Sequence, residues 1–561
     1  MTASALFPPG LVLVAGGLLL PFLRGGLRSV ALIVFPLVTL ALVWDVPDGA
    51  ALRAPFLGYD LVLVSGDRLS RLFALVFAIM AFAGGLFALG QSRTAELAAA
   101  FVYAGSAIGV AFAGDLITLF IWWEVMAIGS TLVVWCGGAH ARGAGLRYAS
   151  IHLLGGALLM AGIAGEIAAS GSIALGKLDL STVPRWLMLA GFLINAGAPP
   201  LSAWLPDAYP ESSWSGMVFL SAFTTKAAVY VLLRAFPGTE LLIYIGLFMI
   251  FYGIVYAILE NDMRRILAYS IVNQVGFMVA GIGIGTEMAL NGAASHAFTH
   301  IVYKALLLMS AGSVLYMTGK RKCTDLGGLF RTMPLTTVCG IVGALSISSF
   351  PLTSGFISKS MISDAAASQH LEYVWYLLAA ASAGVFLHAG IKFPWFVFFQ
   401  KDSGLRPPDP PWNMRLAMLL FAAICIGLGV APGALYALLP YKVDYVPYTA
   451  SHVVSQLQLL LFSGLAFFLL LGWLKRTLTI TLDFDWLYRR LGTTLARGLD
   501  AAAESLWRAL AGLTGALGKL AHERLHRHHG PDGVLGRTWP TGTMAFWTTV
   551  MLAAYLILSN L

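Results

Sequence analysis

The chain has 561 residues, of which 58% are hydrophobic and only 11% are charged. A soluble globular protein carries roughly 25% charged residues, so this composition excludes a soluble enzyme with an ordinary polar surface; it also excludes disorder, collagen and a disulfide-rich scaffold. The net charge of +8 arises from 35 Lys and Arg against 27 Asp and Glu. We therefore predict an all-α polytopic membrane protein with about 14–16 transmembrane helices.

Sixteen apolar segments are long enough to cross a bilayer. No basic stretch precedes the first segment and no small-residue cleavage site follows it, so we interpret it as a retained span rather than a signal peptide. The polar loop at 45–68 has the alternation and turn residues of a small hairpin. The predicted spans are 5–23, 28–44, 69–89, 95–113, 115–136, 147–169, 186–205, 214–234, 241–259, 264–285, 289–317, 335–365, 372–398, 413–433, 453–474 and 543–560.

Basic residues concentrate in every second loop between these spans, which predicts that those loops lie inside and that the N-terminus lies outside. The opposite loops carry only scattered basic residues, such as Arg53 and Lys177. The predicted inner loops and their edges hold Arg24, Arg28, Arg93, Arg142, Arg147, Arg264, Arg265, Lys320, Arg321, Lys322 and Arg331.

Two spans are interrupted by proline in mid-membrane. The seventh contains Pro199 and Pro200, and the twelfth contains Pro351 and Gly355. Non-helical backbone at membrane depth is tolerated only where protein or a wet cavity satisfies it. A packing kink is the alternative for one such break, but a matched pair five spans apart predicts two inverted five-helix repeats with a pathway at their interface.

The segment 475–541 is too polar to span, yet leucine and alanine recur along it in steps of three and four. This spacing predicts an amphipathic helix that lies along the inner membrane surface or along other subunits. We divide the chain into N-terminal spans with the outer hairpin (1–94), a first inverted repeat (95–236), a second inverted repeat (237–400), C-terminal spans (401–474), the amphipathic surface helix (475–541) and a last span (542–561).

Two lone charges lie inside the first predicted repeat. Glu124 is in the middle of the fifth span and Lys226 in the middle of the eighth. Charge inside a bilayer is costly, so such residues are functional candidates by default. If the two approach each other, each stabilises the charged form of the other and a proton competes with the pair, which gives a switchable site. A purely structural ion pair is the alternative.

His296, His300 and Lys304 are spaced four residues apart, so they line one helix face over roughly 12 Å. Histidine titrates near neutral pH, and a row of such groups can pass protons through water. Zinc is the rival interpretation, but no Glu follows the first histidine as in H-E-x-x-H and no third ligand is evident, so we predict no metal site. Either histidine alone is compatible with a merely structural role.

Three further ionisable residues lie at or beyond the second break. Lys359 follows the break at the place where a transporter has its exit gate, and His388 and Lys392 share one face of the next span. For Lys392, near the inner end, snorkelling of the ammonium group to the membrane surface is the alternative. His152 and Glu166 lie on the sixth span, and we interpret Glu166 as peripheral.

Together these residues resemble the antiporter-like subunits shared by Mrp-type cation/proton antiporters, respiratory complex I and membrane-bound hydrogenases, with the D-type Mrp protein closest. The resemblance covers roughly residues 60–400 and rests on four motifs. It implies that Glu124 is the glutamate of the first half-channel, that Lys226 is the lysine of the eighth span and that Lys359 is the terminal lysine, linked by the histidine row. The motifs are Trp204–Ala208, Arg264–Ser270 with Gln274 and Gly276, His296/His300/Lys304, and Ser354–Lys359.

One position departs from this family. A lysine usually stands at the first helix break, paired with the glutamate, whereas this chain has Asn195 there. Either Lys226 takes over the pairing with Glu124, or the first half-channel works differently, or it is impaired. The surface helix and the last span resemble the long lateral helix of the largest family members.

The resemblance implies a subunit of a multi-subunit complex in a bacterial inner membrane that performs Mrp-type monovalent cation/H⁺ antiport. The sequence predicts proton translocation and leaves open whether Na⁺ is also transported. No nucleotide, flavin or iron–sulfur motif is present, so we expect no cofactor and no enzymatic activity in the chain itself. The alternatives are a proton-pumping membrane-arm subunit of a complex I-like oxidoreductase or hydrogenase, an accessory subunit of an ion-coupled uptake complex, and a solitary transporter of a small solute.

Overall fold

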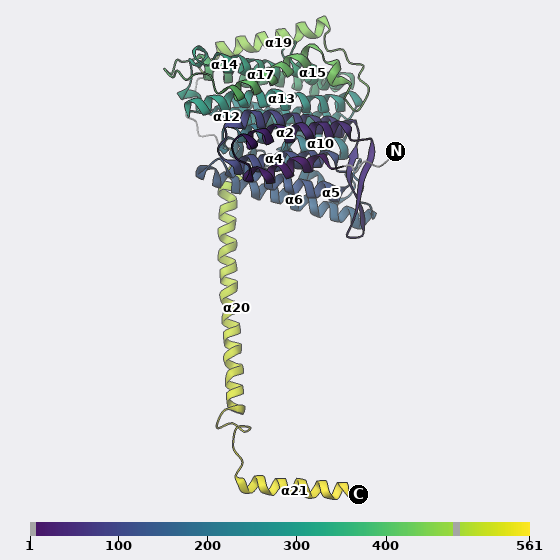
Figure 1. Cartoon of the computed structure of the whole chain (residues 1–561), viewed down its shortest axis with the longest axis vertical. Helices are drawn as coiled ribbons and strands as arrows, with labels where there is room; N and C mark the ends of the chain where they lie inside the picture. Colours follow the sequence, from purple (N-terminus) through teal and green to yellow (C-terminus); the bar gives the residue numbers. More distant parts are fainter. Residues whose placement is uncertain (1–6, 475–482) are drawn as a thin grey trace. The chain divides into compact units, whose positions relative to one another are not determined.

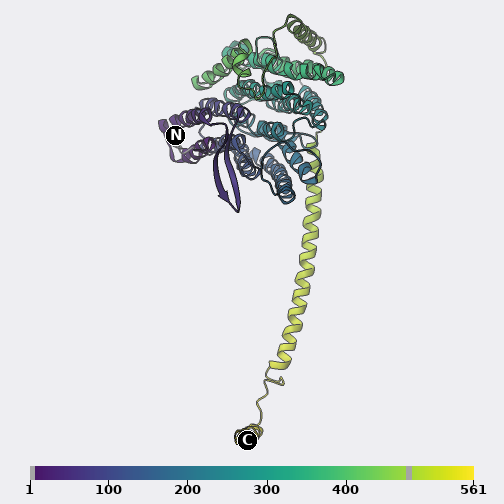
Figure 2. The ribbon, with the colours of Figure 1, turned by 90° about the vertical axis from the view of Figure 1, so that its right-hand side faces the viewer.

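The computed structural model describes residues 7–474 and 483–561 and divides into two units, Met1–Asp485 and Trp486–Leu561. The first unit is a bundle of helices that lie side by side (Figures 1 and 2). Its helices are α1 (Pro9–Leu19), α2 (Gly25–Asp45), α3 (Arg68–Phe87), α4 (Thr94–Phe112), α5 (Leu116–Trp135), α6 (Arg142–Ser170), α7 (Val183–Ala196), α8 (Trp204–Ala208), α9 (Gly216–Leu220), α10 (Thr224–Ala235), α11 (Leu241–Leu259), α12 (Met263–Ile284), α13 (Glu287–Thr318), α14 (Pro334–Ile347), α15 (Ser354–Ser368), α16 (Glu372–Val385), α17 (Trp412–Val430), α18 (Gly433–Tyr436) and α19 (Ala450–Leu469).

The predicted all-α polytopic membrane architecture is confirmed. In the described part of the chain, 13 helices are long and apolar enough to cross a membrane, and three shorter apolar helices accompany them. Every one of the predicted spans corresponds to one or more of these helices. The shorter ones are Pro9–Phe22, Val183–Ala196 and Pro334–Ile347, and the last two are the first halves of the spans interrupted by proline.

The predicted hairpin is present as the antiparallel strands β1 (Gly49–Phe56) and β2 (Tyr59–Gly66), at one end of the bundle (Figure 1). Asp115 fastens it to the bundle. One oxygen of the Asp115 carboxylate accepts from the Val62 amide (2.7 Å) and the other caps α5 at the Thr118 amide (2.7 Å). A capped helix start therefore also fixes the outer hairpin.

Both proline breaks end a helix in mid-bundle. After the first break, the Trp204 indole donates to the carbonyl of Ile194 near the end of α7 (2.9 Å). At the second, Gly355 passes so close to the carbonyl of Ser346 that a Cβ atom has no room. Glycine is needed there for close backbone approach, so the geometry of the second break depends on it.

Two interruptions were not predicted. The span expected at 214–234 is divided by a turn at Ser221–Phe223, between α9 and α10, and contains no proline. The span expected at 372–398 becomes π-helical over Phe386–Lys392 and again over Trp395–Phe399. A Cβ atom at Gly390 would collide with Ser348, so the first π-helical stretch packs directly on the second break.

The second unit contains α20 (Gly492–His529, 38 residues) and the apolar helix α21 (Thr541–Ser559). The predicted helix is therefore confirmed over 492–529 and the predicted last span over 541–559. Residues 475–482 lie outside the described residues, and the course of α20 along a membrane or along other subunits stays a prediction.

The second break gives a stability prediction. Gly355→Ala should destabilise the protein by about 1–3 kcal/mol, because the added methyl group must displace the Ser346 carbonyl. The apparent melting temperature of the purified protein in detergent measures this. Gly427→Ala on α17 is the matched control, because no atom lies within 4 Å of its new Cβ; equal melting temperatures for the two variants would contradict the account.

Candidate functional site

The middle of the bundle holds a row of buried titratable side chains on α13. His296, His300 and Lys304 are all completely buried. His296 Nδ1 bonds to the Ser358 hydroxyl (3.0 Å) and Nε2 to the Gln274 amide oxygen (3.1 Å). The row predicted from the four-residue spacing is therefore present on one face, and its first histidine joins α12 to α15.

The other two members of the row differ in how they are held. Lys304 Nζ donates to the Ser270 hydroxyl (2.8 Å) and to the Leu267 carbonyl (3.4 Å), both on α12. Neither ring nitrogen of His300 has a hydrogen-bond partner in the described part of the chain. The charges of Lys226, Lys304 and Lys359 all act on His300. His300 is therefore a buried imidazole whose two nitrogens are without a partner in the described residues.

Lys359 lies at the second break, in the first turn and a half of α15. Its ammonium group donates to the carbonyl of Ile347, the last residue of α14 (3.1 Å), and lies 4.8 Å from the centre of the Phe277 ring. The break thus leaves a carbonyl group at the end of α14 without a partner within the helix, and the lysine donates a hydrogen bond to it.

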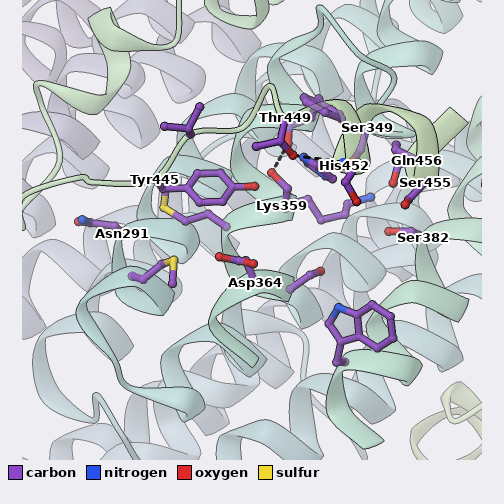
Figure 3. A pocket seen from close by; sticks show the side chains of 18 of the residues that line it. Asn291, Ser349, Lys359, Asp364, Ser382, Tyr445, Thr449, His452, Ser455 and Gln456 are labelled. Carbon is purple, nitrogen blue, oxygen red and sulfur yellow. Dashed lines mark hydrogen bonds between the residues drawn. The ribbon is translucent and has the colours of Figure 1, made fainter. Parts of the chain in front are cut away.

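Lys359 also lines a cavity of about 1000 Å³. Figure 3 shows its side chain among Tyr445, Thr449 and His452, with Asp364 across the cavity. The rim includes Glu287, the first residue of α13, whereas the other end of α13 leads into the basic loop at 320–322. The cavity is therefore at the end of the bundle that the Lys/Arg bias places outside.

Lys226 repeats this arrangement in the first half of the bundle. It is completely buried, and its Nζ donates to the Ser221 carbonyl (2.6 Å) and to the Thr225 hydroxyl (3.1 Å). Ser221 directly follows the last residue of α9, so the unpredicted interruption supplies the partner of this lysine.

Glu124 lies apart from Lys226. No hydrogen bond or ion pair joins them in the described residues, and the carboxylate oxygen Oε1 of Glu124 is buried without a partner. This carboxylate packs against Gly156 of α6, where a Cβ atom would collide with it. The pairing of Glu124 with Lys226, one of the alternatives that Asn195 left open, is not formed.

The residue next to Asn195 is His152, whose role in the site was missed. His152 Nδ1 bonds to the Asn195 amide oxygen (2.9 Å), while Nε2 is buried and without a partner in the part of the chain described. His152 is one helical turn from Gly156, which touches Glu124. The four-residue spacing of His152 and Gly156 puts both on one face of α6 and could have indicated their link to the site. It does so only once α5, α6 and α7 are known to lie together.

His388 and Lys392 lie on the π-helical stretch. His388 Nδ1 bonds to the Gly384 carbonyl (2.9 Å), and the charges of Lys304, Lys359 and Lys392 act on it. Lys392 is 4% exposed and donates to the carbonyls at the end of α11, at Ala257 (3.1 Å), Glu260 (2.5 Å) and Ile258. Lys392 therefore does not snorkel, and its contacts hold the end of a helix.

Two of the sequence motifs brace the loop that leads into α9. Asp207 forms a two-point ion pair with Arg147 (2.7 and 2.8 Å). Arg264 donates to the carbonyls of Pro210, Ser212 and Ser213 (2.7–2.8 Å). These arginines fix the backbone that positions α9 and hence the carbonyl that Lys226 uses.

Comparison with known proteins places the chain in a family. The family described as "NADH:quinone oxidoreductase/Mrp antiporter, TM" matches residues 113–387. The probable A/B subunit of a K⁺/H⁺ antiporter of Rhizobium meliloti is 31% identical over 361 residues, which are 59% of this chain and 36% of that protein. The chain thus spans only about a third of this relative.

Two relatives are covered more fully. The D subunit of the Na⁺/H⁺ antiporter of Alkalihalophilus pseudofirmus is 30% identical over 58% of this chain and 70% of its own length. The N subunit of the NADH-quinone oxidoreductase of Desulforudis audaxviator is 30% identical over 60% of this chain and 74% of its own length.

Solved structures share the fold. A chain of the Mrp complex from Dietzia sp. superposes with a TM-score of 0.77 at 22% identity, over 91% of this chain and 62% of that one. A chain of an archaeal membrane-bound sulfane sulfur reductase superposes with a TM-score of 0.70 at 23% identity, over 99% of both. With 70% of the Alkalihalophilus antiporter protein covered at 30% identity, the chain belongs to the NADH:quinone oxidoreductase/Mrp antiporter transmembrane family, as its motifs predicted.

Proposed function

We propose that this chain is the ion-translocating subunit of a multi-subunit complex in a bacterial inner membrane and that it exchanges protons for a monovalent cation such as Na⁺. The observation that carries this proposal is a longer series of buried titratable groups, which extends the α13 row to Lys226 on one side and to Lys359 at the outer cavity on the other. From here on, "the row" means this longer series. Buried ionisable groups are costly in a membrane protein, so a row of them is retained for transport. Relatives named as Na⁺/H⁺ and K⁺/H⁺ antiporter subunits support the same activity.

Repulsion between the lysines moves the proton in this scheme. The charge of Lys226 acts on Lys304, and the charges of Lys226 and Lys359 act on His296. Protonation of one group therefore disfavours protonation of its neighbours, and charge states alternate along the row. The Ser358 hydroxyl, bonded to His296 (3.0 Å) and to Thr299 (2.9 Å), connects α13 to α15, the helix that carries Lys359.

In this scheme the proton pathway through the first half of the bundle begins at Glu124. The family resemblance implies a lysine at the position of Asn195. Here Asn195 is bonded to His152, whose Nε2 is buried without a partner in the described residues and accepts a proton in this scheme. A histidine held by an amide does the work of a proton acceptor without the permanent charge of a lysine. The first half is therefore a working half-channel with different chemistry, and the subunit itself carries out transport rather than a chemical reaction.

A redox-driven complex is the second candidate. The chain of the archaeal respiratory complex, a sulfane sulfur reductase, superposes over 99% of both lengths, which includes α20 and α21. In that case the same row would move protons under the force of electron transfer in partner subunits. The subunits that copurify with the tagged chain distinguish the two candidates: small antiporter subunits favour cation exchange, and a redox module favours the pump.

The first test removes the last group of the row. Lys359→Ala should lower proton movement in inverted membrane vesicles by at least about tenfold, the usual effect of losing a proton-transfer group, because no other ammonium group lies between the row and the cavity in the described residues. Assembly of the complex, measured by copurification, should be unchanged. Lys177→Ala, in an exposed loop, is the control, and full transport by Lys359→Ala would contradict the proposal.

The second test cuts the row in its middle. His300→Phe fills the same space but accepts no proton, so transport should again fall by at least about tenfold. The same vesicle assay measures it, with His522→Gln on the exposed surface of α20 as the control for loss of a histidine. Equal transport by both variants would show that the proton does not pass through His300.

A further inference from the structure

A second cavity, of about 440 Å³, lies on the basic end of the bundle, opposite the cavity at Lys359. Arg93, Arg264 and Arg321 line it together with Gln91 and Ser213. The Lys/Arg bias places this end of the bundle inside the cell.

Glu96, in the first turn of α4, lies directly beneath this cavity and is only 1% exposed. Its Oε1 accepts from the hydroxyls of Ser213 (2.5 Å) and Ser215 (2.6 Å) and from the Gln91 amide (3.2 Å). Two of these three donors also line the cavity. The carboxyl group is therefore separated from the cavity by one layer of exchangeable side chains.

The other oxygen, Oε2, is buried and has no hydrogen-bond partner in the described residues. The charges of Arg93 and Arg264 act on Glu96, and Glu96 acts on the Cys136 thiol, but both guanidinium groups are bonded to backbone carbonyls instead. A buried acceptor without a donor is costly unless it carries a proton of its own.

Glu166 shows what a structural carboxylate looks like in the same protein. It is 6% exposed, and both its oxygens accept from the Arg185 guanidinium at 2.9 Å. Glu96 has no such counter-ion bonded to it. Its contacts therefore fit a group that gains and loses a proton better than one that only holds a loop.

Further along α4 from Glu96 lies a set of buried hydroxyl groups, which no hydrogen bond among the described residues joins to the Glu96 carboxyl group. Tyr103 is two helical turns further along α4, and its hydroxyl bonds to that of Thr224 (2.6 Å), two residues before Lys226. The Tyr148 hydroxyl donates to Ser130 on α5 (2.9 Å), the helix that carries Glu124. The Tyr209 ring lies 6.3 Å from that of Tyr148, centroid to centroid, and its hydroxyl is buried without a hydrogen-bond partner in the described residues.

We propose that Glu96 is the proton-uptake group of the inner face, which takes protons from the basic cavity and passes them through the tyrosine hydroxyls to the first half of the row. The step conserves atoms and charge: a hydronium ion in the cavity gives a proton to the Glu96 carboxylate and becomes water. The carboxyl group then releases that proton inward and is again a carboxylate, each hydroxyl accepts one proton as it releases another, and the proton reaches the region of Lys226 and Glu124. This inference rests on the proposed proton transport.

The test uses the tagged native complex, reconstituted into liposomes. In Glu96→Gln the amide oxygen still accepts from Ser213 and Ser215, so the loop stays in place but no proton is carried. Proton transport should fall by at least about tenfold, with an unchanged melting temperature. Glu211→Gln, a carboxylate on the same face that is paired with Arg321, should transport normally.

Two further measurements separate proton uptake from a structural role. In Glu96→Ala, formate added on the inner side should restore part of the transport, because a small weak acid fits the cavity; formate on the outer side should not. A hydrophobic carbodiimide, which reacts with protonated buried carboxyl groups, should label Glu96 but not Glu166 in the wild-type complex.

Each outcome bears on one claim. If the wild-type complex transports and Glu96→Gln transports equally well, the inference is wrong. A fall in both transport and melting temperature, without formate rescue, would assign Glu96 a structural role and also overturn it. If the wild-type complex transports no protons, the proposed function fails, and the carbodiimide result alone decides whether Glu96 holds a proton: no adduct means that it does not.

Discussion

The proposed pathway depends on lysine ammonium groups bonded to the carbonyls that interrupted helices leave open. Lys226 uses the carbonyl after α9, and Lys359 uses the end of α14. A buried ammonium group without a counter-ion and a buried helix end without donors are each costly. Together they satisfy each other, because the carbonyl end of a helix carries partial negative charge.

This pairing has a property that an ion pair with a carboxylate lacks. A carbonyl group cannot be protonated near neutral pH, so it accepts a hydrogen bond from the lysine whether the lysine is charged or neutral. The site therefore keeps its geometry through both protonation states. A pathway that must gain and lose protons without rearranging the bundle needs this tolerance.

The middle of the row is held differently. Lys304 is bonded to the Ser270 hydroxyl and to the Leu267 carbonyl, whereas neither ring nitrogen of His300 has a partner in the described residues, so His300 is the least tightly held of these groups. The pair of His152 with Asn195 fits this scheme as a neutral acceptor in the first half.

The sequence predicts those features that depend on composition and proline. The spans, the hairpin and both proline breaks follow from hydropathy and from backbone chemistry. The interruption at Ser221–Phe223 could not be predicted, because no proline or glycine marks it; packing and the bond to Lys226 stabilise it instead. The π-helical turn at Phe386–Lys392 likewise depends on contact with the second break.

The site was predicted only in part, because the sequence does not show which segments pack together. Spacing along one helix places the α13 row, but it says nothing of which helices meet. The contact of α6 with Asn195 and Glu124, and the layer of serines around Glu96, join segments far apart in the chain.

The most direct measurement of the central claim is ion transport by Lys359→Arg. Arginine keeps the positive charge and the hydrogen-bond donors that the Ile347 carbonyl needs, but it does not release its proton in a protein. The account predicts a complex that assembles normally and moves no protons in reconstituted vesicles. Transport at the wild-type rate would show that Lys359 acts by its charge alone, and would contradict the claim that it changes protonation state.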